Sequence, residues 1–355
     1  MEKINIAVLF GGVSPEHEVS LRSAQSILSN IDREKYQVFP IGITKAGKWV
    51  YYGGTEYDAL PDGSWIHCEE NREAVISPSR THGMLLLAPD GGVRMQRIDC
   101  VFPVLHGENG EDGSVQGLMQ LAGIPCVGPG VGASAAAMDK TLTKLVADEA
   151  GVRQAAWYLV RFSEFCKRPE DILSQMEGRF AYPMFVKPAG TGSSVGVSKA
   201  SDRAALIQAI DNAGAYDEKI LVEEFVDGRE IEVAVLGNEA PIASCCGEIV
   251  ANAEFYDYDA KYVSDCAKLW IPAEIPEESS DALRHAAVRI YKALGCRGLS
   301  RVDFFLTRNG GEAVFNEINT LPGFTSISMY PKLFAQEGIS YADLIDRIIG
   351  YAMEQ

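Results

Sequence analysis

The sequence predicts an α/β protein that also contains antiparallel hairpins, so that it is α+β in parts. Near the N-terminus, a buried-strand pattern, INIAVLFGG, is followed by a helical pattern, SPEHEVSLRSAQSILSNI. Such alternation is typical of a parallel sheet, whose ligands bind beyond the carboxyl ends of the strands. Later, AYPMFVKPAGTGSSVGVSKA and RVDFFLTRNGGEAVFNEIN each have the pattern of two strands joined by a loop or turn.

Composition and charge limit the class of protein. A chain of 355 residues is long enough for two or three domains, and 47% hydrophobic with 23% charged residues is typical of a soluble globular protein. The net charge of -17 disfavours nucleic acid and anionic membranes as partners. No apolar run approaches the roughly 20 residues that span a bilayer, and the N-terminus has a strand pattern rather than that of a signal peptide. We therefore expect a cytoplasmic protein.

The eight cysteines are scattered along the chain, and none of them forms a C-x-x-C pair. This spacing lacks the usual zinc or redox signature. We expect reduced and mostly buried thiols.

The first strand leads through a glycine turn into a helix that begins with acids. We expect Ser14 to be the N-cap and Pro15 the first helical residue, with Glu16 and Glu18 in the first turn, where the helix dipole favours acids. Glu16 is then either a ligand-binding group or simply a favourable first-turn charge. His106 follows the strand VFPVL and opens the loop GENGEDG, which puts it at the mouth of a predicted cleft, although a lone histidine is usually structural.

A small-residue helix, ASAAAMDKTLTKLVADEAG, begins a second part of the chain after Gly130. The loop PAGTGSS further on offers closely spaced backbone N–H groups and two hydroxyls, which can wrap polyphosphate oxygens. It is not a Walker A loop, because GK[ST] is absent and a strand follows. Lys187 precedes this loop, and Lys140 can approach from the small-residue helix. The alternative is a flexible hairpin with exposed lysines.

Acids gather around the bend VDGR, between two further predicted strands. Glu223, Glu224 and Glu230 can accept hydrogen bonds from an adenine amino group and a ribose, or they can be surface charges. The segment from Gly247 to Lys268 has no clear period and contains three tyrosines, so we predict a lid or binding loop.

The last predicted hairpin carries four polar side chains that can face one another. Side chains alternate between the two faces of a strand, and an odd loop centred on Gly310 would put Asp303 opposite Glu317 and Arg301 opposite Asn319. Two facing carboxylates repel each other unless something positive lies between them. Oxygen donors without Cys or His suit Mg²⁺ or Mn²⁺ rather than zinc. The alternative is a solvated face on which Arg301 neutralises the acids.

Seven stretches together resemble the D-alanine–D-alanine ligase family of the ATP-grasp superfamily, and they occur in the order typical of that family. They are FGGVSPEHEVSLRSA, VLHGENGEDGSVQG, MDKTLTK, FVKPAGTGSSVGVSK, FYDYDAKY, RVDFFL and NEINTLPGFTSISMYP. The resemblance covers nearly the whole chain. It implies an ATP-grasp fold with an N-terminal Rossmann-like domain (1–125), a central domain (126–218) and a C-terminal domain (219–355) with a lid loop (247–268). The antiparallel sheets of the last two domains would hold ATP between them.

The resemblance also implies a nucleotide site with two Mg²⁺ (or Mn²⁺) ions. Asp303, Glu317 and Asn319 match the metal ligands of the family. The implied nucleotide contacts are Lys140, Lys187, Ser193, Ser194, Glu223, Val226, Glu230 and Lys261. Among these, Glu223 and the backbone around Val226 would face the adenine, and Glu230 would hold the ribose.

The implied activity is the ATP-dependent ligation of two D-alanine molecules through an acylphosphate, for peptidoglycan precursor synthesis. Glu16 would take the ammonium group of the first D-alanine, with His106 near its carboxylate, while Ser328 and Met329 would line the second site. The implied catalytic residues are Glu16, Ser193, Tyr262, Arg301 and Gly323.

Two of these catalytic groups would act on developing charge: Arg301 beside the transferred phosphate and, with the backbone N–H of Gly323, at the tetrahedral oxyanion. Glu16, Ser193 and Tyr262 would form a hydrogen-bonded set that links the first helix, the phosphate loop and the lid. The lid would exclude water from the acylphosphate. The family habit is a homodimer formed through the N-terminal domain.

Related ligases of vancomycin-resistant bacteria use D-serine or D-lactate as the second substrate. The D-lactate type lacks the lid tyrosine, which this chain has as Tyr262, and Met329 stands where resistance-type ligases often have arginine. D-alanine is therefore favoured, with D-serine the stronger competitor. Ile327, where many members have histidine, affects only fine specificity.

Two wider alternatives differ in what they require of the sequence. A ligase for other carboxylates and amines would not need the DAKY lid together with Glu16. A non-catalytic nucleotide-binding protein would be expected to have lost at least one member of the hairpin set. All four of its members are present: Arg301, Asp303, Glu317 and Asn319.

Overall fold

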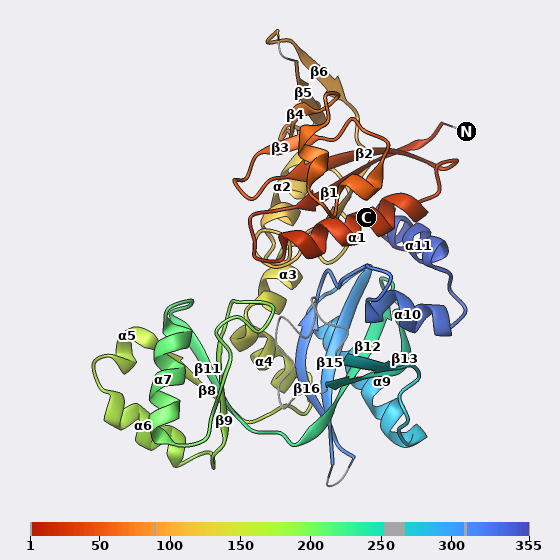
Figure 1. Ribbon diagram of the computed structural model, residues 1–355. Coiled ribbons are helices and arrows are strands. Elements are labelled where there is room, and N and C mark those ends of the chain that lie inside the picture. Colours follow the sequence, from red (N-terminus) through yellow and green to blue (C-terminus); the bar gives the residue numbers. More distant parts are fainter. Residues whose placement is uncertain (1, 89, 252–266, 309–310, 355) are drawn as a thin grey trace.

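The computed structural model describes residues 2–88, 90–251, 267–308 and 311–354. Figure 1 shows three sheets in three parts of the molecule: the first at the top, the second at the lower left and the third at the lower right. Both ends of the chain lie in the upper part of Figure 1, where the C-terminal helix lies beside the first helix.

The first sheet has seven strands in the order β6-β5-β4-β3-β2-β1-β7. The predicted parallel pairing is confirmed for β2, β1 and β7, while β2 to β6 pair in antiparallel fashion. Its strands are β1 (Ile4–Gly11), β2 (Tyr36–Ile43), β3 (Trp49–Tyr51), β4 (Arg72–Ile76), β5 (Met84–Leu87), β6 (Val93–Gln96) and β7 (Cys100–Val104). The helices in this part are α1 (His17–Asn30), α2 (Ser114–Ala122) and the short 3₁₀ turns η1 (Tyr57–Ala59) and η2 (Ser64–His67).

Helix α1 begins later than the sequence suggests. The prediction of Ser14 as the N-cap was wrong, because the helix starts at His17 and Glu16 occupies the cap position. The Ser14 hydroxyl instead donates to the carbonyl of His106 (2.7 Å) and accepts from the N–H of Glu16. Since Glu16 makes no side-chain cap, its carboxylate is available to the space beyond the strand ends.

A pair of helices, α3 (Val131–Met138) and α4 (Lys140–Glu149), links the first sheet to the second. The sequence suggested one helix here. The break falls at Asp139, whose extended backbone and side chain cap α4 by accepting from the N–H groups of Thr141 and Leu142. Lys140 thereby becomes the first residue of α4.

The second sheet has four antiparallel strands in the order β10-β9-β11-β8. The strands are β8 (Trp157–Arg161), β9 (Met184–Pro188), β10 (Ser198–Ala200) and β11 (Lys219–Glu224), and the helices are α5 (Phe162–Phe165), α6 (Pro169–Glu177) and α7 (Arg203–Gly214). Apolar residues of α6 and α7 pack against the sheet in one core. Because β11 pairs with β8 and β9, we propose that the central domain ends after Glu224 rather than at residue 218.

The third sheet is antiparallel, in the order β14-β13-β12-β15-β16. Its strands are β12 (Gly228–Leu236), β13 (Ile242–Ala251), β14 (Ala267–Trp270), β15 (Leu299–Thr307) and β16 (Ala313–Asn319), with helices α9 (Glu277–Ala293), α10 (Met329–Gln336) and α11 (Tyr341–Met353). Val302 and Phe304 of β15 pack into a core with α9. Strand alternation therefore turns Arg301 and Asp303 to the opposite face.

Both ends of the predicted lid loop, residues 247–268, belong to strands rather than to a loop. Its first residues, GEIVA, complete β13, and the last four of them pair with β14, which begins at Ala267. The remainder of the predicted lid, including Lys261 and Tyr262, lies outside the described residues.

The core of the first sheet extends into the C-terminal part of the chain. Phe10 and Phe102 of the first sheet share a hydrophobic cluster with Phe324, Tyr330 and Ile348. The segment that follows β16 is thus held against the N-terminal part of the molecule, at the strand ends where Glu16 and His106 lie.

Candidate active site

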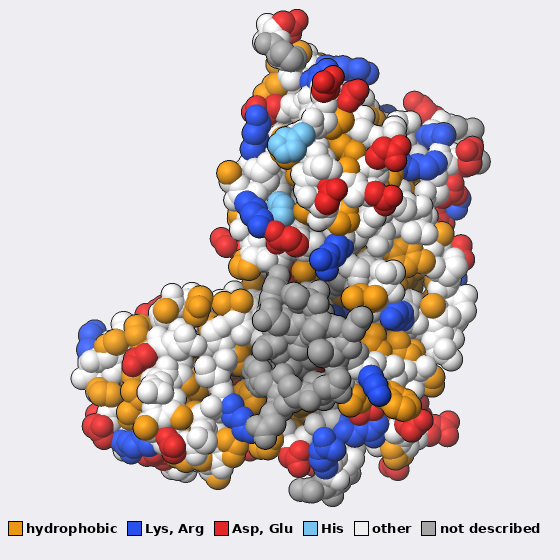
Figure 2. Space-filling model, in the orientation of Figure 1, with side chains coloured by type: hydrophobic (Ala, Val, Ile, Leu, Met, Phe, Trp, Pro, Cys, Tyr) orange, Lys and Arg blue, Asp and Glu red, His pale blue; other side chains and the backbone are white. Residues whose placement is uncertain are grey.

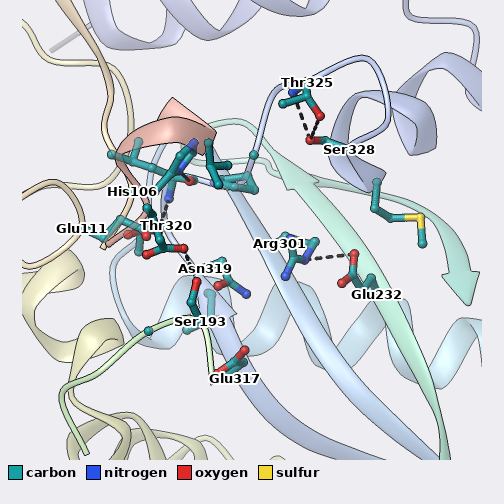
Figure 3. Close-up of a pocket in the computed structure, with 18 of the residues that line it drawn as sticks. His106, Glu111, Ser193, Glu232, Arg301, Glu317, Asn319, Thr320, Thr325 and Ser328 are labelled. Carbon is teal, nitrogen blue, oxygen red and sulfur yellow. Dashed lines mark hydrogen bonds and ion pairs between the residues drawn. The ribbon is translucent and has the colours of Figure 1, made fainter. Parts of the chain in front are cut away.

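A cleft runs between the three sheets, and it consists of two adjoining cavities of about 630 Å³ each. One cavity lies toward the N-terminal part and the segment after β16, and the other lies between the second and third sheets. Ser193, Glu232 and Glu317 line both cavities, so the two cavities adjoin at these side chains. Figure 3 shows these side chains converging from separate elements.

The β15–β16 hairpin has the predicted pairing at its far end: Arg301 lies opposite Asn319, and Asp303 lies opposite Glu317. We expected an odd loop centred on Gly310 to set this register, but a bulge in the hairpin sets it instead. Nearer the turn, Phe304 pairs with Phe315, so the ladder is shifted by one residue and a bulge separates the two registers.

The extra residue at this bulge is Asn316, which lies between the two paired positions. As a consequence, Asn316 and Glu317 both line the cleft although they are neighbours in sequence. A regular strand would have sent one of them to the core.

Arg301 lies among acids on this face of the third sheet. Its guanidinium donates to both carboxylate oxygens of Asp303 at 2.8 Å, and its Nε lies 3.1 Å from Glu232 Oε2 (Figure 3). The amide nitrogen of Asn319 also donates to Asp303, at 2.9 Å. Asp303 and Glu232 therefore hold Arg301 from two neighbouring strands, β15 and β12.

A buried ionic group lies at the other end of the cleft. Glu223 forms ion pairs with Lys144 and Lys187, each 2.5 Å away, and its side chain is only 5% exposed. Burial alone would raise the pKa of Glu223, but the two lysines together lower it to about 2. Burial would likewise lower the pKa of Lys187, and the charge of Glu223 reverses this and raises it. Lys187 also donates to the Asn316 side chain at 3.1 Å.

The glycine-rich loop between β9 and β10 reaches across the cleft. Ser193 and Ser194 have φ values of 51° and 59°, in the left-handed region that non-glycine residues seldom adopt. The Ser193 hydroxyl donates to Glu16, which joins this loop to the start of α1. Lys140 donates from its Nζ to the carbonyl of Thr191 at 2.6 Å, so the loop is also tied to α4.

The loop after β7 contacts the segment after β16. His106 Nδ1 lies 3.0 Å from the carbonyl oxygen of Leu321, and Glu111 accepts from the Leu321 N–H, also at 3.0 Å. Burial lowers the pKa of His106. Burial and the nearby charge of Glu16 raise the pKa of Glu111 to about 7.

Comparison with known proteins identifies the chain's relatives. Family models described as "D-ala D-ala ligase N-terminus" and "D-ala D-ala ligase C-terminus" match residues 5–129 and 146–350. A D-alanine–D-alanine ligase of Caldicellulosiruptor bescii is 49% identical over 355 residues, covering 100% of this chain and 96% of that protein. The chain belongs to the D-alanine–D-alanine ligase family.

Solved structures agree with membership of the D-alanine–D-alanine ligase family. The D-alanine–D-alanine ligase from Coxiella burnetii has a TM-score of 0.87 and 34% identity, covering 100% of this chain and 95% of that one. The VanG D-Ala:D-Ser ligase from Enterococcus faecalis has a TM-score of 0.90 and 40% identity, covering 99% and 100%. The fold is thus the ATP-grasp fold predicted from the sequence.

The residues that the D-alanine–D-alanine ligase resemblance singled out come together wherever the structure describes them. In the cavity toward the N-terminal part these are Glu16, His106, Lys140, Ser193, Arg301, Glu317, Asn319, Gly323, Ser328 and Met329. In the cavity between the second and third sheets they are Lys140, Lys187, Ser193, Ser194, Glu223, Val226, Glu230, Asp303 and Glu317. What each residue does there stays a prediction.

The sequence analysis missed three charged residues of the site: Lys144, Glu232 and Glu111. For Lys144 and Glu232, the spacing in the sequence could have indicated a place in the site. Lys144 follows Lys140 by one helical turn, and Glu232 alternates with apolar residues in step with Glu230. Glu111 had no such signal, because its partner Leu321 is 210 residues away.

Proposed function

We propose that this protein joins two D-alanine molecules at the expense of ATP, releasing ADP and phosphate. The observation that carries the proposal is that Arg301, Asp303, Glu317 and Asn319 share one face of a cleft in a chain of this family. A nucleotide-binding protein without activity would have no need to keep this set together.

We assign the cavity between the second and third sheets to ATP. Lys187, Lys140 and the loop bearing Ser193 and Ser194 supply cations, hydroxyls and backbone N–H groups for the phosphates. Glu223 keeps acceptor capacity for an adenine amino group, because each carboxylate oxygen can accept more than one hydrogen bond.

We further assign the backbone at Val226 to the adenine ring and Glu230 to the ribose. Both residues line this cavity. Lys261 completes the proposed nucleotide contacts and lies outside the described residues.

The hairpin fits two Mg²⁺ or Mn²⁺ ions, with Asp303, Glu317 and Asn319 as their proposed ligands. All donors offered are oxygens, since Asn319 uses its amide nitrogen toward Asp303 and keeps its carbonyl oxygen available. Bound ions of this kind neutralise the phosphate charge and orient the terminal phosphoryl group. Asp303 would then share its oxygens between the ions and Arg301.

The first step is a phosphoryl transfer. A carboxylate oxygen of the first D-alanine forms a bond to the γ-phosphorus, and the bond to the bridging oxygen breaks with its electron pair leaving on ADP. Arg301 stabilises the charge on the moving group. Glu16 holds the substrate ammonium group, and its own carboxylate is oriented by Ser193.

The second step forms the amide. The amine of the second D-alanine attacks the acyl carbon, and the tetrahedral oxyanion is held by Arg301 and the N–H of Gly323. The C–O bond to phosphate then breaks, phosphate leaves with the electron pair, and the departing phosphate can take the proton that the nitrogen gives up. Ser328 and Met329 would line the second-substrate site, and Tyr262, which lies outside the described residues, would close it as part of the lid.

A second candidate is a ligase that takes D-serine as its second substrate. The likeness to the VanG D-Ala:D-Ser ligase, at 40% identity, is the observation that favours it. Met329 and the lid tyrosine are the residues on which we base the preference for D-alanine over D-serine and D-lactate.

We also propose a cytoplasmic homodimer, formed through the N-terminal domain, that binds neither nucleic acid nor membranes. The net charge is -17, and in Figure 2 acidic and basic side chains are interspersed over the visible face. None of the described helices is long and apolar enough to cross a membrane. Edge strand β6 exposes Val93 and Met95, which suits association in this part of the chain. Light scattering on the purified protein measures the dimer.

The proposed function is tested by measuring ADP release and dipeptide formation with ATP and Mg²⁺. We expect D-alanine alone to support both, and added D-serine or D-lactate to give little mixed product. Release of ADP only with D-serine present would favour the second candidate. The absence of any amino-acid-dependent ADP release would refute both candidate functions.

A further inference from the structure

The segment from Thr320 to Phe324 contains Gly323, whose N–H we assign to the oxyanion. A glycine N–H is easily misdirected, because glycine itself imposes almost no conformational preference. Something outside the segment must therefore fix its direction. The structure offers a set of contacts that does so from the N-terminal part of the molecule.

The N–H and the carbonyl oxygen of Leu321 are both hydrogen-bonded to side chains from the loop after β7. Glu111 accepts from the Leu321 N–H at 3.0 Å, and His106 Nδ1 contacts the Leu321 carbonyl oxygen at 3.0 Å (Figure 3 shows His106 and Glu111). We call Glu111 and His106 the Leu321 clasp. Leu321 is only 4% exposed, so these contacts are shielded from water.

The hydrogen bonds of the clasp have a definite direction. A carbonyl oxygen can only accept, so His106 Nδ1 carries the proton. In the neutral ring, which burial favours, Nε2 then accepts from the Ser23 hydroxyl at 3.2 Å. Ser23 in turn accepts from the N–H of Phe324 at 3.3 Å. The segment is thereby held on both sides of Gly323.

Pro322 completes the restraint, since its ring fixes its own φ near −65°. With Leu321 held by the clasp, Pro322 rigid and the Phe324 N–H bound to Ser23, little freedom is left to the peptide between Pro322 and Gly323. This peptide carries the proposed oxyanion donor.

We propose that Glu111, with His106, is a positioning residue that aims the Gly323 N–H at the oxyanion of the amide-forming step. The inference rests on the proposed function and goes beyond it, because it assigns a role to an acid that is not among the proposed nucleotide contacts or metal ligands. It also means that residues of the N-terminal part of the chain position a group that acts in the amide-forming step.

Only a carboxyl group, with two oxygens, suits this position. Its Oε2 accepts from the Gly107 N–H at 2.9 Å while Oε1 accepts from Leu321. A glutamine would place its NH₂ group against one of these two N–H donors and would lose that contact. Glu111→Gln is therefore expected to resemble Glu111→Ala. The exposed Glu108 of the same loop supplies the control, Glu108→Gln.

The test measures ADP and dipeptide together in rapid-quench reactions of the full chain with ATP, Mg²⁺ and D-alanine. We expect one ADP per dipeptide for the wild type and Glu108→Gln. In both Glu111 variants dipeptide formation should fall about 10- to 100-fold, the scale of a misplaced catalytic group. ADP should fall much less, because a stalled acylphosphate is lost to water, so the ratio of ADP to dipeptide rises above one.

Equal losses of ADP and dipeptide would overturn the inference, because a purely structural role only lowers the amount of active enzyme. Wild-type rates in both Glu111 variants would overturn it as well. A wild-type protein that releases no ADP with D-alanine would refute the proposed function and this inference with it, and that outcome is distinct from the other two.

Discussion

Lys144 Nζ lies 2.5 Å from Glu223 Oε1, and the two side chains are only 2% and 5% exposed. Lys187 approaches the other oxygen of the same carboxylate. One acid thus balances two lysines in the wall of the proposed nucleotide cavity. The group links α4, β9 and β11, so a change in it affects both stability and the site.

Lys144→Met is expected to destabilise the protein by about 1.5–3 kcal/mol, because Glu223 loses one of its two buried charged contacts and keeps only Lys187. Unfolding in urea measures the change in free energy. Lys292→Met, on the exposed side of α9, serves as the control and should change stability by less than about 0.5 kcal/mol. Equal stability of Lys144→Met and the wild type would contradict the buried ionic group.

The lowered pKa of Glu223 predicts that the stability of the folded protein depends on pH. Its folded-state pKa of about 2 lies below the ordinary value of 4.5, so the group stabilises the folded protein above pH 4.5 and loses this effect as the pH falls toward 2. The difference in unfolding free energy between the wild type and Glu223→Gln should therefore be constant near neutral pH and shrink below 4.5. A difference that does not depend on pH would contradict the assignment.

Gly107→Ala tests the packing around Glu16. Gly107 has φ +70°, and an added Cβ would lie 2.5 Å from Glu16 Oε2. We expect the displaced carboxylate to raise the KM for D-alanine about 10-fold or more, since one charged contact contributes roughly 1.5–3 kcal/mol. The backbone strain alone costs about 1 kcal/mol of stability.

The control for this strain is Gly63→Ala. Gly63 has φ +79° and no atom within 4 Å of an added Cβ, so it carries the backbone cost without the clash. If both variants showed the same KM for D-alanine, Glu16 would not be the ammonium-binding group.

Local patterns predicted the elements of the fold well. Alternation of apolar residues was enough for the hairpin that carries Arg301 and Asp303, and the facing of Asp303 and Glu317 is confirmed. The bulge at Asn316 was not predictable, because it depends on how the two ends of the ladder fit their surroundings. The expected cap at Ser14 failed for a related reason: its hydroxyl has a better partner in the distant carbonyl of His106.

Long-range partners account for what the sequence could not indicate at the site. The loop GENGEDG contains three acids, and nothing in the sequence distinguishes Glu111 from the other two. Only its contact with Leu321, seen in the structure, does so. The roles of residues such as His106 and Gly323 came from the family resemblance rather than from any local pattern.

The central claim is that the β15–β16 hairpin binds the cations that hold the terminal phosphate of ATP. Crystals grown with ADP, Mn²⁺ and phosphate, measured for anomalous scattering from manganese, test it most directly. We predict manganese peaks about 2.0–2.3 Å from side-chain oxygens of Asp303, Glu317 and Asn319. Manganese bound to the nucleotide with none of these three side chains as a ligand would contradict the account.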